Sequence, residues 1–268
     1  MNEQLAGGKL LLDSPAEAVV RLRISNPERR NALDHEILDA IAETVPRLDQ
    51  GIETRCLLIT GAPPVFSAGY DIASIPTETF ERDAEALVAH PFHAATEALA
   101  NHPWPTVAAI NGHCIGGGLE LAVTCDLRIA AAGAQLGMPP VKLGLVYSHT
   151  GLRKFLDTIG LARTKELFLT GRNFEAARAA EIGLVHEVVP AEQLEEAAVA
   201  LAAEIAGNAP LSMRGNKSAI DLLTASPVIS EQQEAGLIAL RESCFASEDF
   251  REGIKAFAEK RKPEWKGR

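Results

Sequence analysis

The stretch INGHCIGGGLELAVTCDLRIA, residues 110–130, reads as a strand, a tight turn and a helix that begins in three consecutive glycines. Glycine is costly in regular structure, so residues 116–118 indicate that something must approach the backbone closely there. The start of a helix offers unpaired N–H groups and a partial positive charge, which together suit an oxygen of a ligand. The stretch therefore predicts half of an oxyanion hole, with the carboxylate of Glu120 in the same helical turn.

A second small-residue element, FSAGYD at residues 66–71, follows a different predicted strand. Glycines alone would also fit a tight strand-to-helix crossing that serves only packing. With one loop N–H from each element, however, the two segments can hold a single carbonyl oxygen between them. Two such donors can carry much of a catalytic effect, because each is worth about 2.7–4 kcal/mol of transition-state stabilisation.

Hydrophobic periodicity predicts strands at residues 18–24, 55–60, 106–110 and 127–130. Helices are predicted at residues 35–50, with Asp34 as N-cap, and at residues 80–100. The alternation of strands and helices indicates an α/β class with stacked repeating units.

From about residue 191 the pattern changes to successive amphipathic helices without strands. We therefore predict a core over residues 1–205 and a helical region over residues 206–268. Such a region either covers a neighbouring subunit or packs on its own core.

The composition is that of a globular protein, with 268 residues and a formal net charge of −10. The negative charge argues against nucleic acid or an anionic membrane as the main partner. Four cysteines without zinc-ligand spacing fit a reducing compartment, and the sequence shows neither a signal peptide nor a membrane span. A cytoplasmic location and the absence of a metal site are the expectations.

Four segments, taken in order, resemble the enoyl-CoA hydratase/isomerase (crotonase) superfamily. They are FSAGYDI, INGHCIGGGLELAVTCDLRIA, GRNFEAARAAEIGLVHEVV and EGIKAFAEKRKP, and they extend over nearly the whole chain. The resemblance implies an α/β fold, the crotonase (ClpP-like) spiral of repeated ββα units with a C-terminal helical trimerisation region. It also implies an acyl-CoA thioester as substrate, no separate cofactor, a role in fatty acid metabolism, and a homotrimer or dimer of trimers.

Site residues follow from the resemblance position by position. The thioester oxygen would lie between the backbone N–H groups of Tyr70 and Gly117, with Glu120 facing the carbon beside it. The implied contacts to coenzyme A are made by six residues: Arg29, Ala68, Asp71, Ile72, Phe257 and Lys260. Arg29 is equally consistent with a solvated turn residue.

The sequence departs from the hydratase pattern where a second catalytic glutamate is expected, because Pro140 occupies that position. Proline cannot transfer a proton. The segment resembles the methylmalonyl-CoA decarboxylase branch, which also places a tyrosine where Tyr147 stands, and Tyr147 would then orient the malonyl carboxylate. Loss of CO2 yields the enolate directly, so decarboxylation by a lyase needs little beyond the oxyanion hole, with Glu120 or His149 assisting proton return.

Two other functions stay open. A hydratase or isomerase would use Glu120 with Tyr147 or His149 in place of the missing carboxylate. A non-catalytic acyl-CoA-binding protein would keep the same loops, with Glu120 complementing the helix N-terminus, Tyr147 as a packed aromatic and His149 at the surface.

Overall fold

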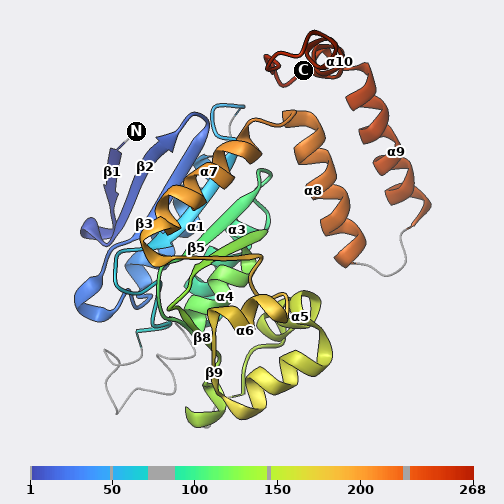
Figure 1. Ribbon diagram of the computed structural model, residues 1–268. Coiled ribbons are helices and arrows are strands. Elements are labelled where there is room, and N and C mark those ends of the chain that lie inside the picture. The colour runs from blue at the N-terminus through green and yellow to red at the C-terminus, as the bar shows by residue number, and fades with distance from the viewer. Residues whose placement is uncertain (1, 49–50, 72–87, 144–145, 226–229) are drawn as a thin grey trace.

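The computed structural model describes residues 2–48, 51–71, 88–143, 146–225 and 230–268 (Figure 1). Within these ranges the fold is mixed α/β, with a main sheet in the order β1-β2-β3-β4-β5-β7-β10. The first three strands are antiparallel, and from β3 to β10 neighbouring strands are parallel. The strands of this sheet are β1 Asn2–Leu5, β2 Leu10–Ala16, β3 Val19–Ile24, β4 Cys56–Gly61, β5 Thr106–Ile110, β7 Leu127–Ala131 and β10 Glu187–Val189.

Both faces of the central strands are apolar, because helices cover each side. Alternate residues of β4, such as Leu57 and Ile59, pack toward α1 (His35–Arg47) and α3 (His93–Ala100). Cys56 and Leu58 point to the opposite face, which α7 (Leu194–Ala206) covers with its alanines. The period-two alternation of a strand therefore places one strand in two hydrophobic clusters.

The sequence predictions for the central elements are confirmed. Strands β3, β4, β5 and β7 lie within one residue of their expected bounds, and α1 begins after Asp34. The carboxylate of Asp34 accepts a hydrogen bond from the Ile37 amide at 2.9 Å, as an N-cap should. The predicted helix at residues 80–100 lies partly outside the described residues. Its described part is a π-turn at Val88–Phe92 followed by α3.

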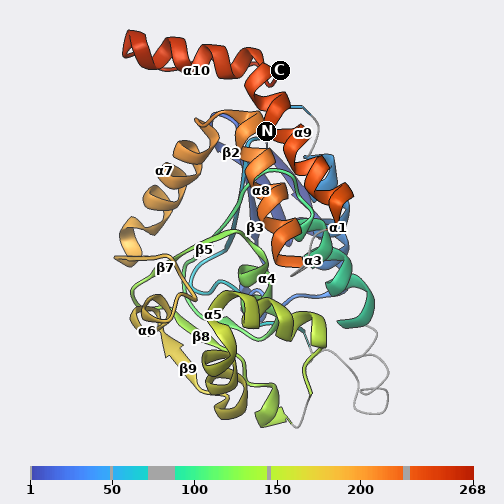
Figure 2. The ribbon, with the colours of Figure 1, turned by 90° about the vertical axis from the view of Figure 1, so that its right-hand side faces the viewer.

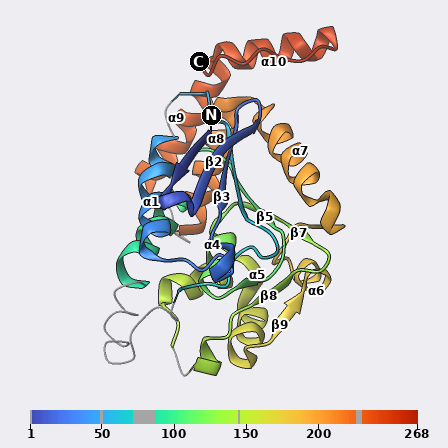
Figure 3. The ribbon, with the colours of Figure 1, turned by 90° about the vertical axis from the view of Figure 1, so that its left-hand side faces the viewer.

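A smaller sheet, in the order β6-β8-β9, was not predicted. Its strands are β6 Cys114–Ile115, β8 Gln135–Gly137 and β9 Asn173–Glu175. The helices α4 (Gly117–Thr124), α5 (His149–Thr170) and α6 (Ala176–Glu181) surround it (Figures 1 and 3). Because β6 leads directly into α4, this sheet fixes the position at which the glycine-rich helix begins.

Three further helices, α8 (Pro210–Ala225), α9 (Glu231–Ala246) and α10 (Glu248–Glu259), follow α7 and extend away from the sheet (Figures 1 and 2). A salt bridge of 2.6 Å between Lys217 and Asp126 ties α8 to the core. The Arg214 guanidinium of α8 lies 5.1 Å from the ring centroid of buried Trp104. The arm formed by α8, α9 and α10 is therefore anchored through α8.

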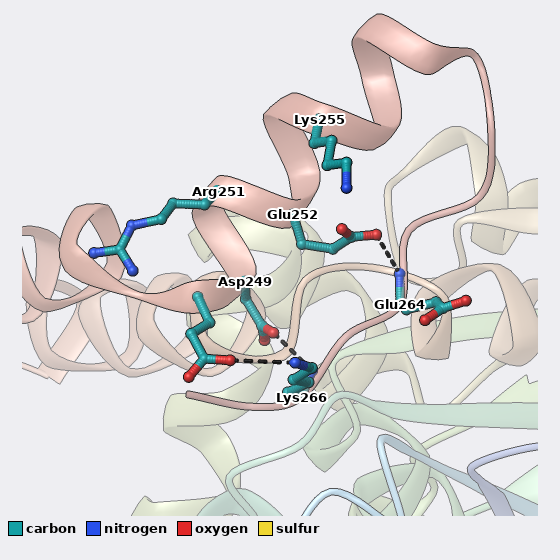
Figure 4. Close-up of a pocket in the computed structure, with 7 residues that line it drawn as sticks. Asp249, Arg251, Glu252, Lys255, Glu264 and Lys266 are labelled. Carbon is teal, nitrogen blue, oxygen red and sulfur yellow. Dashed lines mark hydrogen bonds and ion pairs between the residues drawn. The ribbon is translucent and has the colours of Figure 1, made fainter.

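The C-terminal tail folds back onto α10 (Figure 4). Buried Asp249 accepts hydrogen bonds from the amides of Lys266, at 2.7 Å, and Gly267, at 2.9 Å. The indole of Trp265 donates to the carbonyl of Gly207, just after α7, at 2.6 Å. These contacts connect the tail both to its own helix and to the end of α7.

Candidate active site

Two loops join side by side to form the floor of the candidate site. The backbone amides of Phe66 and Ser67 donate to the carbonyl of His113, and the Ile115 amide donates to the Ser67 carbonyl at 3.0 Å. These bonds extend β6 with a strand-like pairing of Ser67 and Cys114. The small-residue loop after β4 is therefore held against the entry to α4.

Glycine is required at this junction for two separate reasons. Gly69 has φ +92°, a conformation that other residues rarely adopt, and a Cβ there would lie 2.8 Å from the Ile115 carbonyl oxygen. A Cβ on Gly118 would lie 2.7 Å from that of Ser67. Side chains at either position would push the two loops apart.

The amides of Tyr70 and Gly117 lie on the two sides of this junction. A Cβ on Gly69, the residue before Tyr70, would be 3.2 Å from the Gly117 nitrogen, so the two segments are in contact. Within the described ranges neither amide donates to a backbone carbonyl. Free N–H groups from two touching loops are what an oxyanion hole needs.

Glu120 is buried in the first turn of α4 and is bonded at both carboxylate oxygens. The Tyr147 hydroxyl donates to its Oε2 at 2.6 Å, and the Lys154 ammonium donates to its Oε1 at 3.2 Å. The hydroxyl of Tyr70 lies 3.4 Å from that of Tyr147. The sequence predicted Glu120 and Tyr147 as residues of one site, and the structure brings them into direct contact.

Lys154 and Gly151 were not singled out by the sequence. Besides its contact with Glu120, Lys154 donates to the Thr124 hydroxyl at 3.0 Å. A Cβ on Gly151 would lie 2.6 Å from Cε1 of Tyr147 and 2.8 Å from Oε2 of Glu120. Gly151 and Lys154 lie one helical step apart in α5, whereas Tyr147 precedes its N-cap, Ser148, so no periodicity in the sequence linked the three residues.

Burial raises the pKa of both tyrosines, and the charge of Glu120 adds to the effect. For Tyr147, the neighbouring Tyr70 raises the pKa further. Both phenols are therefore protonated at neutral pH and present O–H groups to the site.

The remaining predicted residues are less closely grouped. His149 begins α5 with an exposed side chain. Arg29 pairs with Asp71 at 2.9 Å, so two predicted coenzyme A contacts bind each other. Ala68 is exposed next to them, and Ile72 lies outside the described residues.

Two further predicted contacts belong to the C-terminal arm. Phe257 lies within α10 and Lys260 directly after it, and Figures 1 and 2 show α10 far from α4. Within one chain, these two residues are therefore not brought to the candidate site.

Pro140 stands at the start of a short 3₁₀ turn, Pro140–Leu143, and is buried. It supplies no proton-transferring group. In the part of the chain that the structure describes, no group of three or more His, Cys, Asp or Glu side chains is placed to hold a metal ion. None of the described helices has the length and apolar character needed to cross a bilayer.

The fold and the site together define the crotonase class of α/β proteins, and comparison with known proteins specifies the family. The family profile described as enoyl-CoA hydratase/isomerase matches residues 15–268. The chain therefore belongs to the enoyl-CoA hydratase/isomerase family.

Individual relatives agree with this assignment. A probable enoyl-CoA hydratase of Mycobacterium tuberculosis is 37% identical over 91% of this chain and 93% of its own length. A probable enoyl-CoA hydratase of Bacillus subtilis is 36% identical over 93% of this chain and 95% of its own length.

Solved structures support the fold. A crystal structure of an enoyl-CoA hydratase from Bacillus anthracis superposes with a TM-score of 0.88 at 32% identity, covering 97% of this chain and 100% of that one. A putative enoyl-CoA hydratase/isomerase family protein from Hyphomonas neptunium gives a TM-score of 0.89 at 36% identity, covering 97% and 98%. The family assignment is thus confirmed, whereas none of these relatives is described as a decarboxylase.

Proposed function

We propose that this protein is an enzyme acting on an enoyl-CoA thioester, as a hydratase or isomerase that uses Glu120 to transfer the proton. The observation that carries the proposal is the 2.6 Å hydrogen bond from Tyr147 to Glu120, beside the first turn of α4. This bond joins one carboxylate and one protonated phenol, and Glu120 lies in the same first helical turn as Gly117, whose amide is one of the two proposed oxyanion-hole donors.

The chemistry begins at the thioester oxygen. The amides of Tyr70 and Gly117 would hold that oxygen. They would stabilise the enolate that forms when the acyl group loses a proton or when a nucleophile adds to it. Each such donor is worth about 2.7–4 kcal/mol when its geometry suits the transition state better than the substrate. Neither donor depends on the identity of a side chain, so the loop geometry is the essential element.

One carboxylate is sufficient for the proton transfers. In isomerisation, Glu120 would take a proton from one carbon of the acyl chain and return it to another, leaving the protein unchanged. In hydration, Glu120 would take a proton from water as the oxygen adds to C3, and the same proton would then go to C2. Tyr147 orients the carboxylate and keeps one of its oxygens at the reacting carbons.

Decarboxylation of a malonyl-type thioester is the second candidate, and the presence of Pro140 in place of a second carboxylate favours it. Two tyrosine hydroxyls near one another can also bind a substrate carboxylate. Against it, the substrate carboxylate would lie close to Glu120, and two like charges in a buried site repel each other. In addition, the Tyr147 hydroxyl already donates its hydrogen bond to Glu120.

The test is to incubate the purified protein separately with crotonyl-CoA and with methylmalonyl-CoA. We expect loss of the conjugated double bond of crotonyl-CoA, or solvent deuterium exchange into an enoyl-CoA, without CO2 release. Glu120→Gln should lower kcat by about a hundredfold or more, since general acid–base catalysis contributes about 10²–10⁴. Release of CO2 from methylmalonyl-CoA without hydration would establish the second candidate instead.

A binding protein without activity would give a different result. It would bind acyl-CoA with similar affinity in the wild type and in Glu120→Gln, with no turnover of either substrate by the wild type.

A further inference from the structure

The ring of Tyr70 fills the space beside Gly117. A Cβ on Gly117 would lie 2.7 Å from Cε1 of Tyr70 and 3.0 Å from Cδ1 and Cζ. The same ring also packs against buried Phe92, with centroids 4.8 Å apart and an interplanar angle of 86°. The Tyr70 side chain is thus fixed between the start of α4 and the segment that precedes α3.

Tyr147 meets the Tyr70 ring at its hydroxyl end. Its ring packs on Phe168, at 5.5 Å between centroids, and Phe168 packs on fully buried Phe155 at 5.1 Å. The hydroxyls of Tyr147 and Tyr70 are 3.4 Å apart, so the tips of the two rings meet. Among the described residues, aromatic side chains therefore back both rings.

The direction of the acyl chain follows from Glu120. For proton transfer, C2 and C3 of a bound thioester must lie within hydrogen-bond reach of a Glu120 oxygen. Oε2 is the oxygen that receives the Tyr147 hydroxyl, whereas Oε1 faces Lys154. Carbons beyond C3 would therefore meet the contact between Tyr147 and Tyr70.

We infer that Tyr70 is a specificity-determining residue, whose ring, in contact with Tyr147, closes the acyl end of the site and restricts the enzyme to short acyl groups. The inference rests on the proposed function. It assigns to the Tyr70 side chain a role separate from that of its backbone amide, which any residue at this position would supply.

The protonated state of both phenols agrees with this role. Burial and the charge of Glu120 raise the pKa of the Tyr70 hydroxyl, so it stays neutral at the end of the site. The neutral ring occupies the space into which a longer alkyl chain would extend. Its polar hydroxyl leaves no apolar path beyond the ring.

The experiment compares kcat/KM for straight-chain 2-enoyl-CoA substrates of four, six, eight and ten carbons. We expect the wild type to prefer the four-carbon substrate over the eight-carbon one by about tenfold or more, since even one methylene in a fitted pocket changes kcat/KM by about 10–200-fold. Tyr70→Ala should reduce this ratio by about tenfold or more. Tyr70→Phe keeps the ring and should leave the ratio within about twofold of the wild type.

Two controls keep the outcome decisive. Tyr70→Leu provides a smaller apolar side chain in case Tyr70→Ala does not fold, as judged by circular dichroism and thermal melting. Calorimetric binding of saturated acyl-CoAs of the same lengths measures the restriction without any turnover.

The inference is overturned if the wild type accepts eight- and four-carbon chains equally, or if folded Tyr70→Ala and Tyr70→Leu keep the wild-type ratio. If no acyl-CoA of any length binds to any variant, the proposed function itself fails. If saturated chains bind with the expected length dependence but no enoyl-CoA is converted, the role of Tyr70 stands and the proposed reaction is wrong.

Discussion

Lys154 is the residue whose role is best tested by a single substitution. Its ammonium reaches both Oε1 of Glu120, at 3.2 Å, and the Thr124 hydroxyl, at 3.0 Å, so it holds the carboxylate from the side opposite Tyr147. A hydrogen bond to a charged group is worth about 1.5–3 kcal/mol. We expect Lys154→Met to lower kcat about tenfold to a hundredfold with a smaller change in KM, because the residue acts through Glu120 and does not touch the substrate.

Lys154→Arg should recover most of the lost kcat, since arginine also donates to a carboxylate. Lys165→Met, at an exposed position further along α5, is the matched control and should behave as the wild type. Steady-state kinetics of the three variants decides the matter. Equal losses in Lys154→Met and Lys154→Arg would argue against a positioning role.

Gly151 leads to a second prediction at the residue scale. An added Cβ would come within 2.8 Å of Oε2 of Glu120 and 2.6 Å of the Tyr147 ring, so Gly151→Ala must move one of them. We expect kcat to fall by about tenfold or more while the fold persists. Gly133→Ala, where a Cβ meets no atom within 4 Å, should keep full activity.

The same residues show how far sequence could predict the site. The two small-residue loops were predictable because close backbone approach demands glycine, and Glu120 because it follows in the first turn of the helix. Tyr147 was predicted from the resemblance to the methylmalonyl-CoA decarboxylase branch, which has a tyrosine at that position. The contact of the Tyr70 ring with Gly117 was not predictable, since it depends on how two loops distant in sequence lie against each other. Lys154 was hidden for the same reason.

At the scale of elements, strands with an uninterrupted apolar or alternating pattern were predicted, whereas strands that are very short or interrupted by polar residues were not. β3, β4, β5 and β7 carry five or six residues each in runs that are buried or alternate in burial. β2 contains Asp13, Ser14 and Pro15, and β8 and β9 have three residues each, so neither composition nor periodicity marks them. These strands depend on tertiary pairing.

The C-terminal tail allows a prediction for an element. The Asp249 carboxylate accepts hydrogen bonds from the amides of Lys266 and Gly267, and removing this carboxylate leaves both donors unpaired (Figure 4). We expect Asp249→Ala to destabilise the tail by about 1–3 kcal/mol, seen as faster hydrogen exchange and proteolysis after α10. Glu248→Ala removes only exposed ion pairs and should leave the tail protected. Unchanged protection in Asp249→Ala would show that the remaining contacts, such as those of Trp265 with Gly207 and of Glu264 with Glu252, are enough to hold the tail.

The reactivity of the buried thiols measures global unfolding of the molecule. Burial raises the pKa of Cys56 and of Cys125 to about 12, with the charge of Asp126 as the next cause, and raises that of Cys114 as well. The thiolate is the reactive form, so in a Cys244→Ser background we expect a disulfide reagent at neutral pH to modify these three thiols only on unfolding. Modification of the native protein at the rate of a free thiol would contradict this.

The same shifts give a pH dependence of stability. Between the ordinary thiol value of 9.0 and about 12, the native state keeps protons that the unfolded chain releases. Unfolding therefore becomes easier as pH rises through this range, while below it the thiols contribute their full stability. Urea midpoints measured across the alkaline range should fall, and less so when Cys56 and Cys125 are both replaced by alanine.

The predicted homotrimer belongs to the whole molecule and is argued from the arm of α8, α9 and α10. This arm extends from the core and exposes large apolar side chains on each of its three helices: Ile220 and Leu223 on α8, Ile238 on α9, and Phe250 and Ile254 on α10. Exposed apolar side chains along an arm that leaves the core fit an interaction surface, and a second copy of the chain is the partner that the helical region was predicted to meet.

We expect sedimentation equilibrium to give a trimer, or a dimer of trimers. Ile254→Asp should weaken assembly by placing a charge at the predicted interface, with a shift toward monomer at micromolar concentration. Leu169→Asp substitutes an even more exposed apolar residue of α5, outside the arm, and should assemble as the wild type does. A monomeric wild type would refute the predicted trimer, and dissociation by Leu169→Asp but not by Ile254→Asp would move the interface from the arm to α5.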